Sequence, residues 1–205
     1  SLTLVDTGMF FAQRRILAGL ASIGKHPYDV ARIVLTHAHS DHVGSAGKLL
    51  PKTSAQGTIV HAEDAAFVRA GRSAPASGTF NRLLQGLPGM KYTPVPVMTE
   101  LRDGDVLEVA GTLRVHHTPG HTPGHVSLLH EDSGVLITGD SIFNMNSRLA
   151  WPIAGVCTDF PLTKVTAAVL ADVDYRVAAF THGPHIADGA REQVRGFLSR
   201  EGVVA

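Results

Sequence analysis

The sequence predicts a mixed α/β fold, built as one domain over residues 1–205. Two patterns predict this class. In the first 70 residues, short apolar runs that suit strands alternate with segments of helical spacing. Residues 105–140 then carry four strand-like runs in succession, separated by turn residues. The length fits, because 205 residues that are 44% hydrophobic can bury one core but are short for two domains.

The first half of the chain should contain three strands and three helices. Residues 2–8 (LTLVDTG) alternate and break at Gly8, which is typical of a strand that ends in a turn. Apolar side chains recur at helical spacing over residues 11–23, and Gly24 follows as a stop. The continuous apolar run at 31–36 predicts a strand buried on both faces. The pattern continues with a helix over 43–50, a strand over 57–62 and a helix over 63–70.

Residues 71–98 differ in composition, because they are rich in Gly, Pro and Ser and carry scattered apolar side chains. A connection this long inside a compact domain is usually functional. Its apolar residues show no periodic face that would pack in a core. We therefore expect this segment to form a lid over a substrate cleft or an interface with a second copy of the chain, which would make a homodimer. A solvated excursion is the alternative.

The second half should begin with antiparallel strands and end with helices. Strands are expected over 105–111, 113–118, 125–132 and 134–140, joined by turn clusters such as Asp103-Gly104. Asp159 is placed to cap a helix that runs to residue 173. A strand over 176–183 and a closing helix over 187–200 complete the expected elements.

Composition excludes some classes of partner. Lys plus Arg and Asp plus Glu each number 18, so there is no basic excess of the kind that nucleic-acid binding usually shows. The chain has neither an apolar run long enough to cross a bilayer nor a signal-peptide pattern, so we expect no membrane partner. Cys157 is the only cysteine, which suits a reducing compartment and a cytoplasmic location. We interpret it as a small packed hydrophobe.

The stretch VLTHAHSDHVGS, residues 34–45, carries the strongest chemical signal. Four polar side chains fall within six residues after an apolar run, namely His37, His39, Asp41 and His42. Positions two apart on an extended chain project to one side, so His37 and His39 can reach the same point. Asp41 and His42 follow where the chain turns into a helix, and they can face a second centre. Histidine and carboxylate ligands without thiolate suit zinc, iron or manganese at a reactive site.

Three later residues repeat this arrangement. His121 lies in a Pro-Gly loop between expected strands, while Asp140 and His182 each follow an apolar strand. A carboxylate buried at such a position needs a strong partner. Polar groups at the ends of several buried strands therefore predict one shared site.

The ordered set resembles the metallo-β-lactamase fold superfamily. It consists of His37-Ala38-His39-Ser40-Asp41-His42, then His121, Asp140 and His182. The resemblance extends from Asp6-Thr7-Gly8 to the last helix, and it implies an αββα sandwich with a dinuclear metal site at the edge between two β-sheets. It assigns His37, His39 and His121 to metal one, Asp41, His42 and His182 to metal two, and Asp140 to a bridge. The family has already formed one or two strands where this chain begins, so we expect an N-terminal segment to be missing.

The resemblance also implies a reaction. In the glyoxalase II-like and lactonase-like branch, a hydroxide bridging two zinc ions (iron or manganese in some members) would attack a small ester, lactone or thioester. Asp41 would be the catalytic residue that orients the hydroxide while it ligates. Asp140 argues against a typical β-lactamase. Residues 141–160 depart from the Gly-Arg-type stretch that follows this aspartate in glyoxalase II and in sulfur dioxygenases, which leaves the substrate open.

Two further readings stay open. One is a mononuclear iron sulfur dioxygenase that acts on a persulfide through His37, His39 or His121 together with Asp140. The other is a metal-binding module without catalysis.

Substrate contacts are expected from apolar side chains around the site and from one histidine. These are Phe80, Leu84, Leu87, Met90, Tyr92, Phe143, Met145, Trp151 and His185. His125 is interpreted as a support for the ligands, and His116 or His117 as a support for the loop that carries His121. His26, His61 and His130 are expected to have no chemical role.

Overall fold

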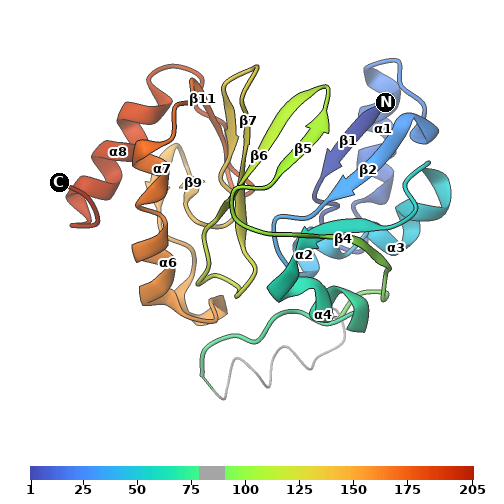
Figure 1. Ribbon diagram of the computed structural model, residues 1–205, viewed down its shortest axis with the longest axis horizontal. Coiled ribbons are helices and arrows are strands. Elements are labelled where there is room, and N and C mark those ends of the chain that lie inside the picture. The colour runs from blue at the N-terminus through green and yellow to red at the C-terminus, as the bar shows by residue number, and fades with distance from the viewer. Residues whose placement is uncertain (79–90) are drawn as a thin grey trace.

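The computed structural model describes residues 1–78 and 91–205, and it shows two β-sheets packed face to face with helices on both outer faces (Figure 1). The first sheet is parallel and has the order β1 (Leu2–Val5), β2 (Val30–Val34), β3 (Thr58–His61), β4 (Val97–Leu101). The second has the order β11 (Val177–Ala179), β8 (Val135–Ile137), β7 (Val126–His130), β6 (Gly111–His117), β5 (Val106–Val109). Strands β5 to β8 are antiparallel, and β11 joins β8 in parallel. The expected αββα sandwich is confirmed.

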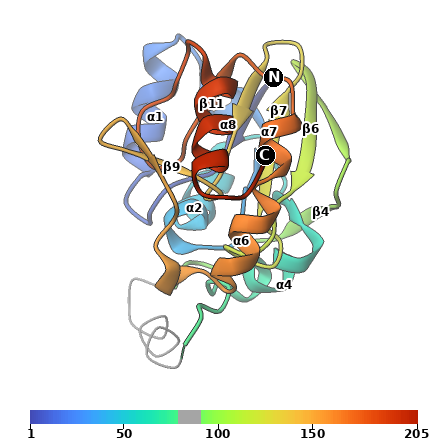
Figure 2. The ribbon, with the colours of Figure 1, turned by 90° about the vertical axis from the view of Figure 1, so that its left-hand side faces the viewer.

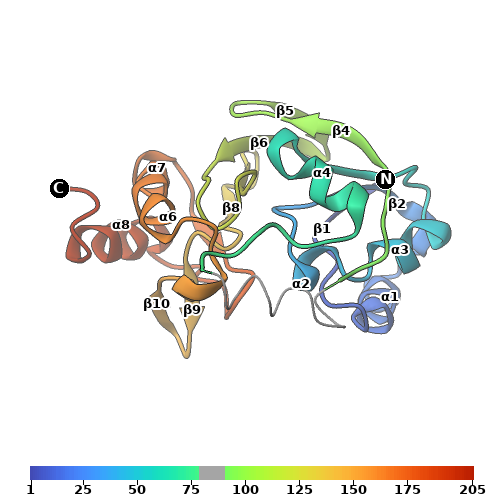
Figure 3. The same cartoon turned by 90° about the horizontal axis from the view of Figure 1, so that it is seen from below.

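The helices divide between the two outer faces (Figures 2 and 3). On the side of the first sheet lie α1 (Gln13–Ser22), α2 (Ser40–Val43), α3 (Ala46–Leu49) and α4 (Ala62–Ala70), with the 3₁₀ turns η1 (Pro27–Asp29) and η2 (Leu50–Lys52). On the side of the second sheet lie α6 (Phe160–Thr166), α7 (Val169–Asp172) and α8 (Ala190–Arg200), preceded by the 3₁₀ turn η3 (Ala154–Val156). None of the helices in the described ranges has both the length and the apolar character needed to span a membrane.

Three buried clusters fill the three interfaces between the layers. Period-two alternation places neighbouring residues of one strand in different clusters. On β2, Ile33 faces the helices of the first sheet, whereas Val34 faces the second sheet. On β7, Leu128 faces the first sheet and Leu129 faces α6 to α8. Both sheets are thus covered on two faces, which explains their continuous apolar runs.

Two expected helices are interrupted. The helix expected over 43–50 is observed as α2 and α3, separated at Gly44 and Ser45. A Cβ at Gly44 would lie 2.6 Å from the backbone nitrogen of Phe10, so the chain passes very close to the segment before α1 at this point. The helix expected over 159–173 is observed as α6 and α7. Asp159 caps α6 as predicted, because its side chain accepts a hydrogen bond from the backbone nitrogen of Leu162.

A hairpin of β9 (Phe143–Met145) and β10 (Arg148–Ala150) was not expected from the sequence. Its turn is formed by Asn146 and Ser147, which have φ values of 52° and 59°. Two successive left-handed residues are the signature of a type I′ hairpin turn, which usually contains glycine. Because this turn contains no glycine, the sequence pattern did not indicate it.

The segment 71–98 differs from its prediction where it is described. Tyr92 and Val95 are buried in the cluster between the first sheet and its helices, and Tyr92 donates a hydrogen bond to the carbonyl of Arg72. The expectation that its apolar residues lack a core partner is therefore wrong for Tyr92, which packs in that core and does not line a substrate cleft. Strand β4 also begins inside this segment, at Val97. Phe80, Leu84, Leu87 and Met90 lie outside the described residues.

Candidate metal centre

The seven predicted ligands meet at one edge of the sandwich because each follows or precedes a strand there. His37 and His39 lie between the end of β2 and the start of α2, which itself carries Asp41 and His42. The other three come from the second sheet. His121 lies in the β6–β7 loop, Asp140 follows β8 and His182 follows β11. Both sheets therefore contribute to one cluster.

Three imidazoles converge on the first position, which we call site 1 (His37, His39 and His121). His39 Nδ1 lies 3.1 Å from His37 Nε2 and 3.0 Å from His121 Nε2. A tetrahedral zinc ion with Zn–N bonds of 2.0–2.1 Å would hold its nitrogens about 3.3 Å apart. All three side chains are buried. The spacing therefore fits three ligands around one divalent ion.

The far nitrogens of two of these rings have partners that fix their orientation. His37 Nδ1 lies 3.0 Å from the hydroxyl of Thr36, and His121 Nδ1 lies 3.4 Å from Sγ of Cys157. Such contacts hold the ring so that Nε2 points into the site. Cys157 is fully buried, as predicted, but its contact with His121 was missed. Burial raises the pKa of its thiol to about 11, so Cys157 stays protonated near neutral pH.

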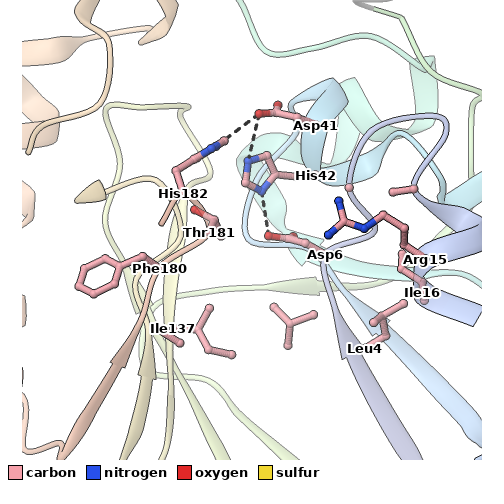
Figure 4. A pocket seen from close by; sticks show the side chains of 14 residues that line it. Leu4, Asp6, Arg15, Ile16, Asp41, His42, Ile137, Phe180, Thr181 and His182 are labelled. Carbon is pink, nitrogen blue, oxygen red and sulfur yellow. Dashed lines mark hydrogen bonds and ion pairs between the residues drawn. The ribbon is translucent and has the colours of Figure 1, made fainter. Parts of the chain in front are cut away.

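Site 2 is formed by Asp41, His42 and His182 (Figure 4). Asp41 Oδ2 lies 3.7 Å from His42 Nε2 and 3.4 Å from His182 Nε2. Both of these nitrogens are buried and have no hydrogen-bond partner among the described residues. A buried polar atom without a partner is costly, and a bound metal ion would supply one. This orphaned pair fits a second metal position.

Asp140 lies between the two sites. Its Oδ2 is 3.1 Å from His121 Nε2 and 3.4 Å from His182 Nε2, while its Oδ1 is 3.5 Å from His42 Nε2. The side chain is buried, and one carboxylate thus reaches ligands of both sites. The backbone nitrogen of Asp140 donates to Nε2 of His125 over 2.7 Å. The structure therefore places His125 behind the ligands, where the sequence predicted a support.

The protonation states of the two sites differ in the metal-free protein. Burial lowers the pKa of His37 well below its usual value and lowers that of His39 to about 3. The carboxylates of Asp140 and Asp41, each 3.4 Å from Nε2, raise the pKa of His182 to about 9. For His42, burial opposes the charge, but Asp140 and Asp6 outweigh it and raise the pKa well above its usual value. At neutral pH the imidazoles of His42 and His182 in site 2 are therefore protonated, whereas those of His37 and His39 in site 1 are neutral.

Site 2 is the side on which the centre opens to solvent. The side chains of Asp41 and His182 are 37% and 35% exposed, whereas that of His37 is 0% exposed. A cavity of about 500 Å³ borders Asp41, His42 and His182 (Figure 4). Much of its lining is apolar, with Leu4, Ile16, Ile137 and Phe180 among the side chains, and Arg15 is the one Lys or Arg among the described lining residues. These residues come from four separate elements, so no local sequence pattern marked them.

The side chains that were predicted to contact the substrate do not all lie near the metal centre. Phe143 packs beside His182, with 4.5 Å between ring centroids. His185 is exposed and does not line the cavity. Trp151 lies elsewhere, because its ring packs on Phe197 of α8 at 4.9 Å and its Nε1 donates to Glu201. Met145 is half exposed in the hairpin.

Two polar residues near the ligands were missed. Asp6 Oδ2 lies 2.8 Å from His42 Nδ1, which turns Nε2 of that ring toward site 2. Its φ of 57° is unusual for a residue other than glycine and is the kind of strain that gathers at functional sites. Thr181 places its hydroxyl 2.6 Å from Asp140 Oδ1. Asp6 belongs to the Asp-Thr-Gly stretch that carries the resemblance, whereas Thr181 gave no signal beyond its place before His182.

Comparison with known proteins places this geometry in a family. A family model described as the metallo-beta-lactamase superfamily matches residues 1–182. A crystal structure of a metallo-beta-lactamase family protein from Thermus thermophilus is 30% identical with a TM-score of 0.73, and the match covers 97% of this chain and 70% of that one.

Two curated relatives agree. A probable metallo-hydrolase of Bacillus subtilis is 28% identical over 184 residues, which cover 89% of this chain and 76% of the relative. A hydroxyacylglutathione hydrolase of Cereibacter sphaeroides is 32% identical over 127 residues, which cover 62% and 39%. With the sandwich and the His/Asp cluster, these matches show that the chain belongs to the metallo-beta-lactamase superfamily.

Proposed function

We propose that this chain is a zinc-dependent hydrolase that cleaves a small ester, lactone or thioester at a dinuclear centre. One observation carries the proposal. Seven donor side chains surround two adjacent positions, and Asp140 stands between them within 3.5 Å of a histidine nitrogen of each. A non-catalytic binding module would need no second position that opens to solvent.

The protein's own groups suit hydrolysis. When bound, a pair of divalent ions would lower the pKa of a water molecule toward neutrality and polarise a carbonyl oxygen of the substrate. Burial raises the pKa of Asp41 and the ring of His182, 3.4 Å away, lowers it, with a net fall to about 2. Asp41 is therefore an ionised, partly exposed acceptor at neutral pH, and it can orient a water molecule at the open side of the centre.

The accessible side of the centre favours a small-molecule substrate. Site 1 is closed by its own buried ligands, so a scissile carbonyl must approach across Asp41 and His182. The apolar cavity that borders site 2 can hold the rest of a small substrate. A relative that bears the name of a hydroxyacylglutathione hydrolase supports the same reaction class.

Metal content provides the first prediction. Because the described residues supply ligands for site 1, site 2 and the bridging position, the purified protein should bind close to two zinc ions per chain. Elemental analysis after dialysis against zinc measures this directly. A single tightly held equivalent at saturating zinc would contradict the dinuclear assignment.

The reaction class needs a substrate panel. Lactones, thioesters, esters and phosphotriesters would be offered to metal-quantified protein, with Asp132→Asn as a matched control, since that carboxylate lies on an exposed turn and accepts a backbone hydrogen bond from Thr112. We expect turnover of at least one carbonyl substrate by both the native protein and the control. One iron per chain, oxygen consumption on a persulfide and no hydrolysis would overturn the proposal in favour of a dioxygenase.

A further inference from the structure

Asp64 connects the two loops that carry the ligands of site 1. It lies in the first turn of α4, and it is 0% exposed. Its Oδ2 accepts hydrogen bonds from the backbone nitrogen of Ala38 and from the hydroxyl of Thr122, each 2.7 Å long. Its Oδ1 accepts a third, also 2.7 Å long, from the backbone nitrogen of Gly124. Ala38 separates His37 from His39, and Thr122 follows His121 directly.

The close approach of Asp64 to the His121 loop depends on a glycine. A Cβ added at Gly124 would lie 2.6 Å from the backbone nitrogen of Asp64 and 2.8 Å from its Cβ. Real Cβ atoms essentially never approach another atom this closely, so any other residue at 124 would push the His121 loop away from α4. The short hydrogen bond from Gly124 to Asp64 therefore depends on glycine at position 124.

Capping of α4 does not explain this carboxylate. The helix is already capped by His61, whose side chain accepts a hydrogen bond from the backbone nitrogen of Glu63. Burying a carboxylate costs free energy unless hydrogen bonds compensate, and the three hydrogen bonds that Asp64 accepts come from the two ligand loops. Its buried carboxyl group therefore joins these two loops.

We propose that Asp64 is a positioning residue for site 1. It sets the distance between the His37/His39 loop and the His121 loop, and through them the 3.0 Å separation of His39 Nδ1 and His121 Nε2. This inference rests on the metal centre proposed above. It adds a residue that contacts neither metal nor substrate and that acts on one site of the pair.

The test is Asp64→Asn, which keeps the volume but turns an amide NH₂ toward one of three donors. Zinc affinity would be measured by competition with a chromophoric chelator in two backgrounds. His182→Ala isolates site 1, and His37→Ala isolates site 2. We expect Asp64→Asn to weaken zinc binding about 10–100-fold in the His182→Ala background, the usual effect of losing an outer partner of a ligand. In the His37→Ala background the affinity should change less than about threefold.

The outcomes separate a positioning role from a general structural one. Asp132→Asn should leave both affinities unchanged. An unchanged affinity at site 1, or an equal loss at both sites, would overturn the role of Asp64. If Asp64→Asn does not fold, Thr122→Val removes one of the three bonds at constant shape, and a smaller loss confined to site 1 is expected; no loss would overturn the inference. A native protein that binds no zinc would instead remove the proposed function on which the inference rests.

Discussion

Replacing Asp140 with asparagine should reduce turnover at least ~100-fold and release one of the two metal ions. The buried carboxylate is 3.1 Å from His121 Nε2 and 3.5 Å from His42 Nε2, so it faces ligands of both sites. Asparagine keeps the shape but removes the negative charge that would separate two divalent cations. Elemental analysis together with steady-state kinetics measures both effects, and circular dichroism reports whether the fold persists.

Asp132→Asn is the matched control for this change, because it makes the same chemical substitution on the exposed turn between β7 and β8. It should keep two metal ions and native turnover. If Asp140→Asn also kept both, the bridging role of Asp140 would be wrong, whatever else the centre does.

Zinc affinity at site 2 should fall at least ~tenfold for each unit by which the pH drops below about 9. His182 has a pKa raised to about 9, and that of His42 is also raised, so both rings carry protons at pH 7 in the metal-free protein. A metal ion must displace these protons before it can bind. Its affinity therefore rises with pH until His182 is neutral.

His37 provides the comparison for this pH dependence. Burial keeps its pKa, and that of His39, below the usual value, so neither ring has a proton to lose between pH 6 and about 9. Chelator competition at pH 6, 7 and 8 should show a steeper dependence for site 2, measured in His37→Ala, than for site 1, measured in His182→Ala. Equal slopes would contradict the assigned protonation states.

Much of the centre could be predicted from the sequence, because its main motif is local. His37, His39, Asp41 and His42 stand together in the chain, and their short spacing restricts where they can point. Asp140 could be added because strands of one sheet deliver their end residues to one edge. The structure brings the predicted ligands to one edge as expected.

The residues that were missed or given the wrong surroundings share a different property, since their role depends on partners that no sequence pattern reveals. Asp64 is held by backbone nitrogens of distant loops, and a backbone N–H carries no residue-specific signal. Trp151 packs on Phe197 and donates a hydrogen bond to Glu201, and both partners lie far along the chain from it. Tyr92 looked like a loop residue because its core partners lie on other elements, and only the folded chain brings them together.

The two halves of the sandwich meet where the metal ligands stand. The outer core of the first sheet draws only on residues up to 97, and that of the second only on residues from 129 onward. Each half therefore has an outer core of its own, beside the cluster that the two sheets share. Bound metal ions would link the two halves, since they would share ligands from both. His37 and His39 come from one half, and the other supplies His121, Asp140 and His182. At a free metal concentration 1,000 times Kd, metal binding would stabilise the folded chain by about 4 kcal/mol. The bound ions would then contribute to the stability of the fold as well as to the proposed reaction.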